Sequence, residues 1–445
     1  PLISLLTPKK SLLMNLETRL RSSAIRYFSS PKYREKNIAR ARKFRHKNRQ
    51  DPIVHYFHQV DDPYSHLAVQ KLNELKKSYD IKFLPHLVSI PDAIYQGNPL
   101  HFAKWSWRDA QLIAQNYNTT FSPSLYTIDL DQVNAANAII FPRLNDHDFA
   151  EVAIEVGTAI WSGNDLGTEN NLASSLEAVR KGNELRKKLG HYQGAMFFFE
   201  GEWFWGVDRI RLLEHRLREE GFSRYQSALC VPEPRPPDIR NSRAIDITLE
   251  YFPSLRSPYT AAGHKRVLDL VNRSNVKLEV RPVMPMLMRG IPAPRSKQRY
   301  IITDASREAR AHGVPFGRII DPFGEPVKRA FSLFPSALDH NRAMEFITAY
   351  IDAAWYDGID ITKHRGLNKI LSNAGLQQNI GKKSGEDIRW KDILENNLEA
   401  MLSENLWGVP SFRISGGELK KPVAFWGQDR IWRVETEIAQ RQLQH

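Results

Sequence analysis

Two stretches of the chain repeat the same order of residues at a constant spacing of 195 positions. The matching pairs are Ile53–Phe57 with Thr248–Phe252, Asp62–Ser65 with Ser257–Thr260, and Ile81–Phe83 with Val276–Leu278. Self-similarity at one fixed spacing is typical of a structural unit that is written more than once. We therefore predict that most of the 445 residues form two copies of one domain.

The ends of the two copies also match, at a larger spacing. Phe204–Arg209 corresponds to Phe425–Arg430 at an offset of 221, which places insertions in the second copy. Between the copies, Cys230–Pro237 contains four prolines, which favour an extended connector. The predicted parts are an N-terminal arm at 1–50, a first domain at 51–229, a linker at 230–245 and a second domain at 246–445.

Hydrophobic periodicity predicts the same order of elements in both copies. Each begins with a strand, a helix and a second strand, continues with helices, and ends with two short strands and a last helix. The predicted strands are Ile53–Phe57, Ile81–Leu84, Ala195–Phe199 and Trp203–Trp205, then Thr248–Phe252, Val276–Val280, Ser411–Ile414 and Val423–Trp426. The main predicted helices between them are Phe149–Gly163, Leu172–Leu189, Asn341–Tyr356 and Trp390–Glu404. This order predicts the α/β class, with two tandem thioredoxin-like domains that each carry an inserted helical subdomain.

Cysteine and histidine usage excludes several kinds of chemistry. Cys230 is the one cysteine, so a dithiol pair and a multi-cysteine zinc site cannot form within these residues. The histidines lack the spacing of metal ligands, so no metal is expected. No apolar run reaches the roughly 18 residues that a membrane-spanning helix needs. We expect a cytoplasmic protein without integral membrane contact.

The positive charge of the chain is concentrated at its start. Residues 1–50 contain 14 Lys or Arg against Glu17 and Glu35, whereas the other 395 residues contain 49 basic and 48 acidic side chains. Few helix-breaking residues interrupt this segment, so it is expected to form a helical arm. A solvated helix is one interpretation. The other is an anionic partner: lipid, RNA or an acidic protein surface.

The second copy resembles a known family in an ordered set of residues. The set is Tyr251-Phe252, Ser257-Pro258-Tyr259, Arg281-Pro282, Lys297, Tyr300, Asp304, Gly408-Val409-Pro410 and Trp426–Arg430. It is similar to the DsbA-like branch of the thioredoxin superfamily that contains 2-hydroxychromene-2-carboxylate isomerases and kappa-class glutathione transferases. The resemblance implies a thioredoxin core with a helical insertion and glutathione as the cofactor, bound at the turn after the first strand.

The resemblance also implies a role for individual residues. Ser257, at a strand-to-helix turn, is the candidate catalytic residue, because its hydroxyl can donate to a bound thiolate and lower the thiol pKa. Val409 and Pro410 resemble the cis-proline loop that pairs with a peptide ligand. The remaining candidate glutathione contacts are Tyr259, Lys297, Gln428 and Asp429, the last two as acceptors for its ammonium group.

Several of these residues also have a purely structural interpretation. Ser257 followed by a proline is a favourable helix start without any ligand. A Val-Pro bond is trans by default, since only about 5 to 6% of such bonds are cis. Asp429 before Arg430 is another good helix start, and Lys297 can be a solvated charge.

The first copy departs from the family pattern at three of these positions. Asp62 stands where the second copy has Ser257, Met196 where it has Pro410, and Val207 where it has Gln428. An anionic Asp62 would repel a thiolate, and it can serve as a helix cap or as an acid or base. We therefore expect a degenerate site in the first domain.

Two functions follow as hypotheses. In the first, the protein is a glutathione-dependent isomerase or transferase in which Ser257 stabilises the thiolate for addition to a small electrophilic substrate. In the second, it is a non-catalytic binding or scaffold protein with a tandem DsbA-like fold, to which the name oxidoreductase applies by family alone. Binding of glutathione distinguishes the two.

Overall fold

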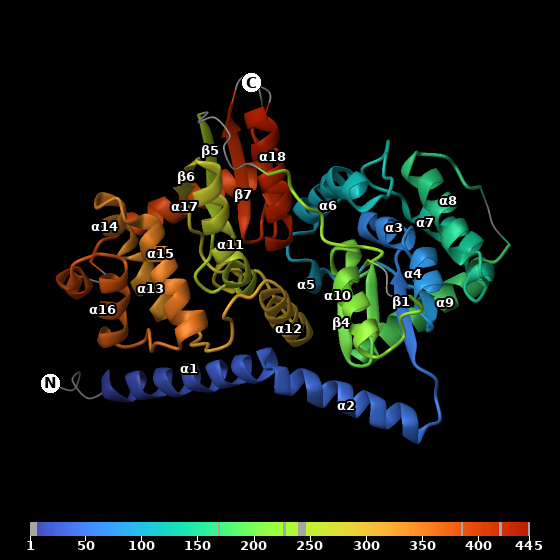
Figure 1. Ribbon diagram of the computed structural model, residues 1–445, viewed down its shortest axis with the longest axis horizontal. Helices are drawn as coiled ribbons and strands as arrows, with labels where there is room; N and C mark the ends of the chain where they lie inside the picture. The colour runs from blue at the N-terminus through green and yellow to red at the C-terminus, as the bar shows by residue number, and fades with distance from the viewer. Residues whose placement is uncertain are drawn as a thin grey trace. The chain divides into compact units, whose positions relative to one another are not determined.

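The fold is given by a computed structural model that describes residues 7–167, 170–225, 228–238, 246–383, 386–417 and 421–443 (Figure 1). The chain divides into two compact units. Unit 1 consists of residues 1–33, 236–291 and 301–445, and unit 2 consists of 34–235 and 292–300. The observed boundaries thus differ from the predicted ones. The predicted arm is divided between the units, and a short piece of the predicted second domain belongs to unit 2.

Unit 2 is built around one four-stranded sheet. Its strands are β1 (Ile53–His58), β2 (Lys82–Leu87), β3 (Met196–Phe199) and β4 (Glu202–Trp205), in the order β2-β1-β3-β4. β1 pairs with β2 in parallel and with β3 antiparallel, and β3 pairs antiparallel with β4. The helices are α3 (Pro63–Val69), α4 (Leu72–Ser78), α5 (Ala93–Gln96), α6 (Pro99–Ile113), α7 (Leu130–Ile140), α8 (Phe149–Trp161), α9 (Leu172–Leu189) and α10 (Gly206–Glu219), with short 3-10 turns η1 (Ala114–Tyr117) and η2 (Phe141–Arg143).

Unit 1 contains a second sheet with the same strand order and the same pairing directions. Its strands are β5 (Ile247–Phe252), β6 (Lys277–Val280), β7 (Ser411–Gly416) and β8 (Val423–Trp426), in the order β6-β5-β7-β8. α11 (Pro258–Ser274) connects the two parallel strands, and α18 (Ile431–Leu443) packs beside it after the turn η6 (Gln428–Arg430). The segments between β6 and β7 are η3 (Met286–Arg289), α12 (Arg295–Ala311), α13 (Glu325–Phe331), α14 (Phe334–Asp339), α15 (Ala343–Ile351), η4 (Asp352–Asp357), α16 (His364–Asn373), η5 (Gln378–Lys383) and α17 (Arg389–Ser403).

The eight predicted strands are present, with ends that differ from the predicted ones by at most three residues. One predicted helix is different. Residues 341–356 were expected to be one α-helix, but α15 ends at Ile351 and the chain continues as the π-helical segment η4. Through this wider turn, two consecutive aromatic residues contact the main chain of residues 255–261. Trp355 donates to Leu255 O at 3.0 Å, and Tyr356 donates to Ala261 O.

The N-terminal residues form two helices, α1 (Thr7–Ser29) and α2 (Pro31–Lys47), as the sequence predicted. α1 packs on unit 1, where Arg21 donates to buried Asp321 at 3.0 Å and Ser22 accepts from the Asp321 amide at 2.8 Å. Among the described residues, no helix is both long and apolar enough to cross a bilayer.

Candidate functional site

The turn between β5 and α11 places Ser257 at the start of a 17-residue helix. Ser257 is the N-cap: its Oγ accepts from the Thr260 amide at 3.1 Å, and Pro258 occupies the first helical position, where a missing N–H costs nothing. The helix-cap interpretation is therefore confirmed. The same hydroxyl donates to the carbonyl oxygen of Val409 at 3.3 Å, so it also contacts the loop before β7.

That loop has the conformation suggested by the resemblance. The bond between Val409 and Pro410 is cis, so the trans expectation for this bond is wrong. Gly408 precedes it because a side chain would not fit: a Cβ there would lie 2.3 Å from the indole nitrogen of Trp426. The Pro410 carbonyl accepts from the Gly427 amide at 2.9 Å, which fixes the loop to the start of η6. Ser257, Val409 and Pro410 are thus brought together.

The side chain of Tyr259 lies against α12. Its hydroxyl donates to Asp304 at 2.9 Å, and Arg307 donates to the other oxygen of the same carboxylate at 2.8 Å. Asp304 is completely buried. The Tyr259 hydroxyl therefore has an intramolecular partner, and its predicted contact with a ligand stays a prediction.

Gln428 also has partners within unit 1. It is 1% exposed, its Oε1 accepts from Arg266 at 3.1 Å, and its Nε2 donates to Glu308 at 2.9 Å. The expected position, with the amide open to a ligand ammonium, is not observed, because the amide joins α11 to α12. Gly263 makes this possible, since a Cβ there would lie 2.8 Å from the Cβ of Gln428.

The other two candidate residues lie in different surroundings. Asp429 is half-buried in η6, just before α18, and its carboxylate folds back over Gly427, a residue with a φ of 105°. Lys297 belongs to unit 2, and its ammonium group donates to the carbonyl oxygen of Tyr95 at 2.6 Å. Burial lowers the pKa of Lys297 to about 8. The interpretation of Lys297 as a solvated charge is wrong, since the residue is 7% exposed.

The corresponding turn in unit 2 is built differently. Asp62 caps α3, accepting from the amides of Tyr64 at 3.2 Å and Ser65 at 3.1 Å, so the cap interpretation is confirmed here as well. Burial raises the pKa of Asp62 to about 7. Where unit 1 has its cis-proline loop, Ala195 donates its amide to the hydroxyl of Ser65 at 2.8 Å.

The unit 1 turn offers a hydrogen-bond donor in a positive field. The N-terminus of α11 favours negative charge. An anion that replaced the Val409 carbonyl would accept the hydrogen bond that the Ser257 hydroxyl donates. The imidazole of His264, further along α11, contacts Tyr251 and Thr348. Burial lowers the pKa of His264 to about 3, so its imidazole is only a weak base. The turn can thus hold an anion but has only a weakly basic histidine on this helix.

Two supporting residues, Glu308 and Arg266, were not predicted. Both are buried or half-buried polar groups on helices whose outer faces are also polar, so hydropathy does not separate them from solvated residues. Glu308 could have been found from its spacing, because it lies four positions after Asp304 and residues at this spacing share one helix face.

In a comparison with known proteins, one family model matches residues in the second half of the chain. Residues 248–439 match the model of the DSBA-like thioredoxin domain. No curated protein matches. A putative protein disulfide isomerase from Nitrosomonas europaea is 12% identical, with a TM-score of 0.36, over 44% of this chain and 99% of its own.

Two further solved structures are similar over the same share of the chain. A 2-hydroxychromene-2-carboxylate isomerase is 16% identical, with a TM-score of 0.36, over 43% of this chain and 95% of its own. The cytosolic disulfide reductase DsbM from Pseudomonas aeruginosa is 15% identical, with a TM-score of 0.34, over 44% of this chain and 98% of its own.

Proposed function

Because residues 248–439 form a DSBA-like thioredoxin domain, we propose that unit 1 binds glutathione at the turn between β5 and α11 and acts as a glutathione-dependent isomerase or transferase. The observation that carries the proposal is the position of Ser257. Its hydroxyl lies at the N-terminus of a long helix and 3.3 Å from the carbonyl oxygen of Val409, beside the cis Val409–Pro410 bond. The hydroxyl, the helix N-terminus and the main chain of half-buried Val409 together suit an extended ligand with an anionic sulfur.

Glutathione would supply a thiolate nucleophile, which the single cysteine of the chain does not provide at this turn. Cys230 belongs to unit 2, where its thiol donates to Ser78, and burial raises its pKa to about 11. Ser257 would hold the thiolate by its hydroxyl, Val409 would pair with the ligand main chain, and Asp429 would accept from the ligand ammonium. Tyr259 and Gln428 would position these groups through α12, and we leave Lys297 out of the site.

The substrate class follows from the same chemistry. A stabilised thiolate adds to electrophilic carbon, so we assign a small electrophilic substrate to unit 1. Unit 2 would be a degenerate copy of the same domain, since Asp62 occupies the position of the serine. A dithiol oxidoreductase mechanism is not proposed, because the 445 residues contain one cysteine.

Thermal unfolding with and without reduced glutathione tests the proposal. At a concentration about 100 times the dissociation constant, binding should stabilise the folded protein by about 2.7 kcal/mol. Ser257→Ala and Ser257→Gly separate the two roles of the serine. Loss of the cap should cost about 1 kcal/mol in the alanine variant but only a few tenths in the glycine variant. Both should raise the thiol pKa of bound glutathione, followed by ultraviolet absorbance.

The scaffold function has one observation in its favour. The Ser257 hydroxyl and the Gln428 amide already have protein partners, so the turn is satisfied without a ligand. An absence of any glutathione-dependent stabilisation would favour this second function and contradict the first.

A further inference from the structure

α2 carries basic side chains on two opposite faces, one of which contacts acidic residues while the other is exposed to solvent. With about 100° of rotation per residue, Arg34, Ile38 and Arg45 lie within about 40° of one another. Lys36, Arg40, Lys43 and Lys47 lie within about 60° of one another on the opposite side. These four residues are called the outer ridge below. From Arg34 onward the helix belongs to unit 2.

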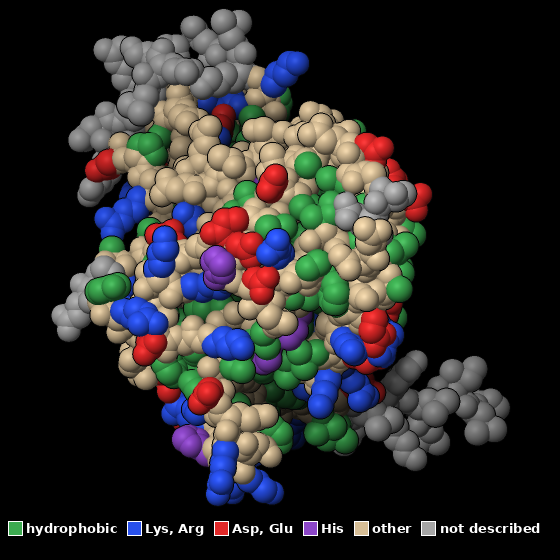
Figure 2. Space-filling model, turned by 90° about the vertical axis from the view of Figure 1, so that its right-hand side faces the viewer, with side chains coloured by type: hydrophobic (Ala, Val, Ile, Leu, Met, Phe, Trp, Pro, Cys, Tyr) green, Lys and Arg blue, Asp and Glu red, His purple; other side chains and the backbone are tan. Residues whose placement is uncertain are grey.

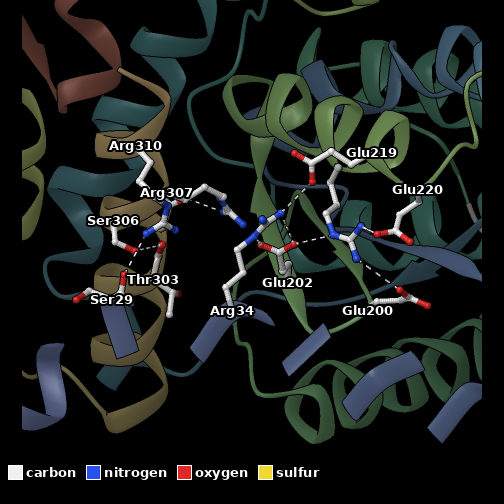
Figure 3. Close-up of polar contacts among 12 residues, drawn as sticks. Ser29, Arg34, Glu200, Glu202, Glu219, Glu220, Thr303, Ser306, Arg307 and Arg310 are labelled. Atoms are coloured by element: carbon white, nitrogen blue, oxygen red, sulfur yellow. Dashed lines mark hydrogen bonds and ion pairs between the residues drawn. The ribbon is translucent and has the colours of Figure 1, made fainter. Parts of the chain in front are cut away.

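The inner face of α2 is held by acidic residues of unit 2. Arg34 donates to Glu202 at 2.8 Å (Figure 3), and Arg45 donates to Glu200 at 2.8 Å. Arg42 contacts Glu200 and Glu220. Ile38, on the same face, is 8% exposed. The charges on this face are therefore neutralised within the protein, and the face anchors the helix.

The outer ridge is exposed along its whole length. All four side chains are open to solvent, and none forms an ion pair or hydrogen bond with any residue that the structure describes. Lys and Arg side chains project from the lower tip of the face shown in Figure 2, which the end of α2 forms. At a rise of about 1.5 Å per residue, the ridge places four cations along about 16 Å of a rigid, anchored helix.

One aromatic residue accompanies these charges. Phe44 is 64% exposed and follows Lys43 directly in the sequence. Single exposed apolar residues are common on protein surfaces, so Phe44 contributes to the argument only through its position beside these cations. Cations that follow a phosphate backbone, together with an aromatic ring that stacks on a base, are the two elements of single-strand recognition.

We propose that the outer ridge and Phe44 bind single-stranded RNA, with its phosphates along Lys36, Arg40, Lys43 and Lys47 and a base stacked on Phe44. A membrane surface fits less well. A helix that lies in a bilayer interface needs a broad apolar face beside its basic residues. On α2 the face opposite the ridge is bound to unit 2, and Phe44 is the one large apolar side chain that the described part of this helix exposes.

The test uses the full chain and a fluorescently labelled 20-nucleotide oligouridylate, with binding followed by anisotropy at several salt concentrations. Four phosphate contacts predict a slope of log K against log salt of about −2.8, which is about a 50-fold loss of affinity between about 50 and 200 mM. The variant K36Q/R40Q/K43Q/K47Q should reduce the slope nearly to zero. Phe44→Leu should weaken binding about tenfold without changing the slope.

A matched control removes the same number of charges elsewhere in unit 2. Lys77, Lys82, Lys187 and Lys188 are exposed, and K77Q/K82Q/K187Q/K188Q should change affinity less than about threefold. Equal losses in the two quadruple variants would overturn the proposal, because diffuse charge would then explain binding. So would ridge-dependent binding to phosphatidylserine vesicles without binding to the RNA. Overlapping thermal unfolding curves for all variants show that the fold is intact.

Discussion

The hydroxyl of Tyr259 donates a hydrogen bond to the buried carboxylate of Asp304, 2.9 Å away. The same relationship exists in unit 2, where Tyr64 donates to buried Asp109 at 2.8 Å. In both pairs the tyrosine lies two residues after the helix cap and the acid lies 45 positions further on. Each pair ties the first helix of its sheet to the inserted helical segment, so the pairs are expected to stabilise the units rather than to react.

Tyr259→Phe removes one donor from a fully buried carboxylate, and hydrogen bonds to charged groups contribute about 1.5 to 3 kcal/mol. We expect a loss of stability of this order, confined to unit 1. Native-state hydrogen exchange followed by mass spectrometry should show faster exchange in α11 and α12.

The matched variant is Tyr64→Phe, which should accelerate exchange in α3 and α6 instead. If either variant accelerated exchange equally in both units, or in neither, the assignment of these pairs as local ties would be wrong.

Gly408→Ala tests the packing of the cis-proline loop. The added Cβ would lie 2.3 Å from the Trp426 indole nitrogen, so either the loop or the ring must move. Overpacking of this kind typically costs about 1 to 3 kcal/mol. We expect a lower denaturation midpoint in urea, together with weaker glutathione stabilisation, because Val409 is the next residue.

Val409→Ala is the comparison for this variant, since it shortens a half-buried side chain of the same loop without a clash. A denaturation midpoint for Gly408→Ala as high as that of Val409→Ala would show that the loop adapts freely.

The strands could be predicted from the sequence because their signals are local. β1 and β5 are short runs rich in β-branched and aromatic residues, and the constant spacing of 195 relates β1 to β5 and β2 to β6. Ser257 as a cap was also readable, since Ser followed by Pro is a local signature of a helix start.

The contacts of long side chains could not be predicted in the same way. Gln428 was expected to face a ligand, but its amide joins Arg266 and Glu308, residues more than 100 positions away in the chain. Lys297 was assigned to the second domain, yet its segment belongs to unit 2. Such outcomes depend on how helices pack, and one sequence does not encode packing in a local pattern.

The contacts of the basic arm could not be predicted from the sequence either. Its charge predicted either solvation or an anionic partner, and both expectations concern charges that face solvent. The acidic residues that hold its inner face, Glu200 and Glu202, lie more than 150 positions away, so no local pattern indicates these contacts.

Gln428→Glu tests the buried contact with Glu308. The substitution places two carboxyl groups within hydrogen-bonding distance, and we expect their mutual repulsion to outweigh the opposing effect of Arg266 and to raise the folded pKa of one of them above the ordinary value of about 4.3. When the pKa of a carboxyl group is higher in the folded state, its contribution to the free energy of unfolding is complete below the pKa of the unfolded state. This contribution is lost as the pH rises through the pKa of the folded state. We expect the melting temperature of this variant to fall further below that of the original protein at about pH 8 than at about pH 5.

Gln428→Met is the neutral control, because it has a similar length and removes both hydrogen bonds without adding a charge. Its loss of stability should be the same at both pH values. A Glu variant that behaved like the Met variant would contradict this expectation, because it would show that the second carboxyl group is not destabilising next to Glu308 and Arg266.

Asp62 in unit 2 has an unusual combination of burial and hydrogen bonding. It is 4% exposed, and besides two amides it accepts from the Ser65 hydroxyl at 2.9 Å. Burial is the main cause of its raised pKa, about 7, and the neighbouring Asp61 adds to it. For two buried histidines the pKa is shifted in the opposite direction, since burial lowers the pKa of His58 to about 3 and that of His66 to about 4.

Asp62→Asn isolates the effect of the carboxyl group on stability. The raised folded pKa predicts that its contribution is complete below about pH 3.9 and is lost as pH rises through about 7. Asparagine is also a good helix cap, so α3 should still form. The melting temperature of the original protein should therefore decline relative to that of Asp62→Asn between about pH 5 and about pH 8. The histidine contributions cancel in this difference, so parallel profiles would show that Asp62 titrates near its ordinary pKa.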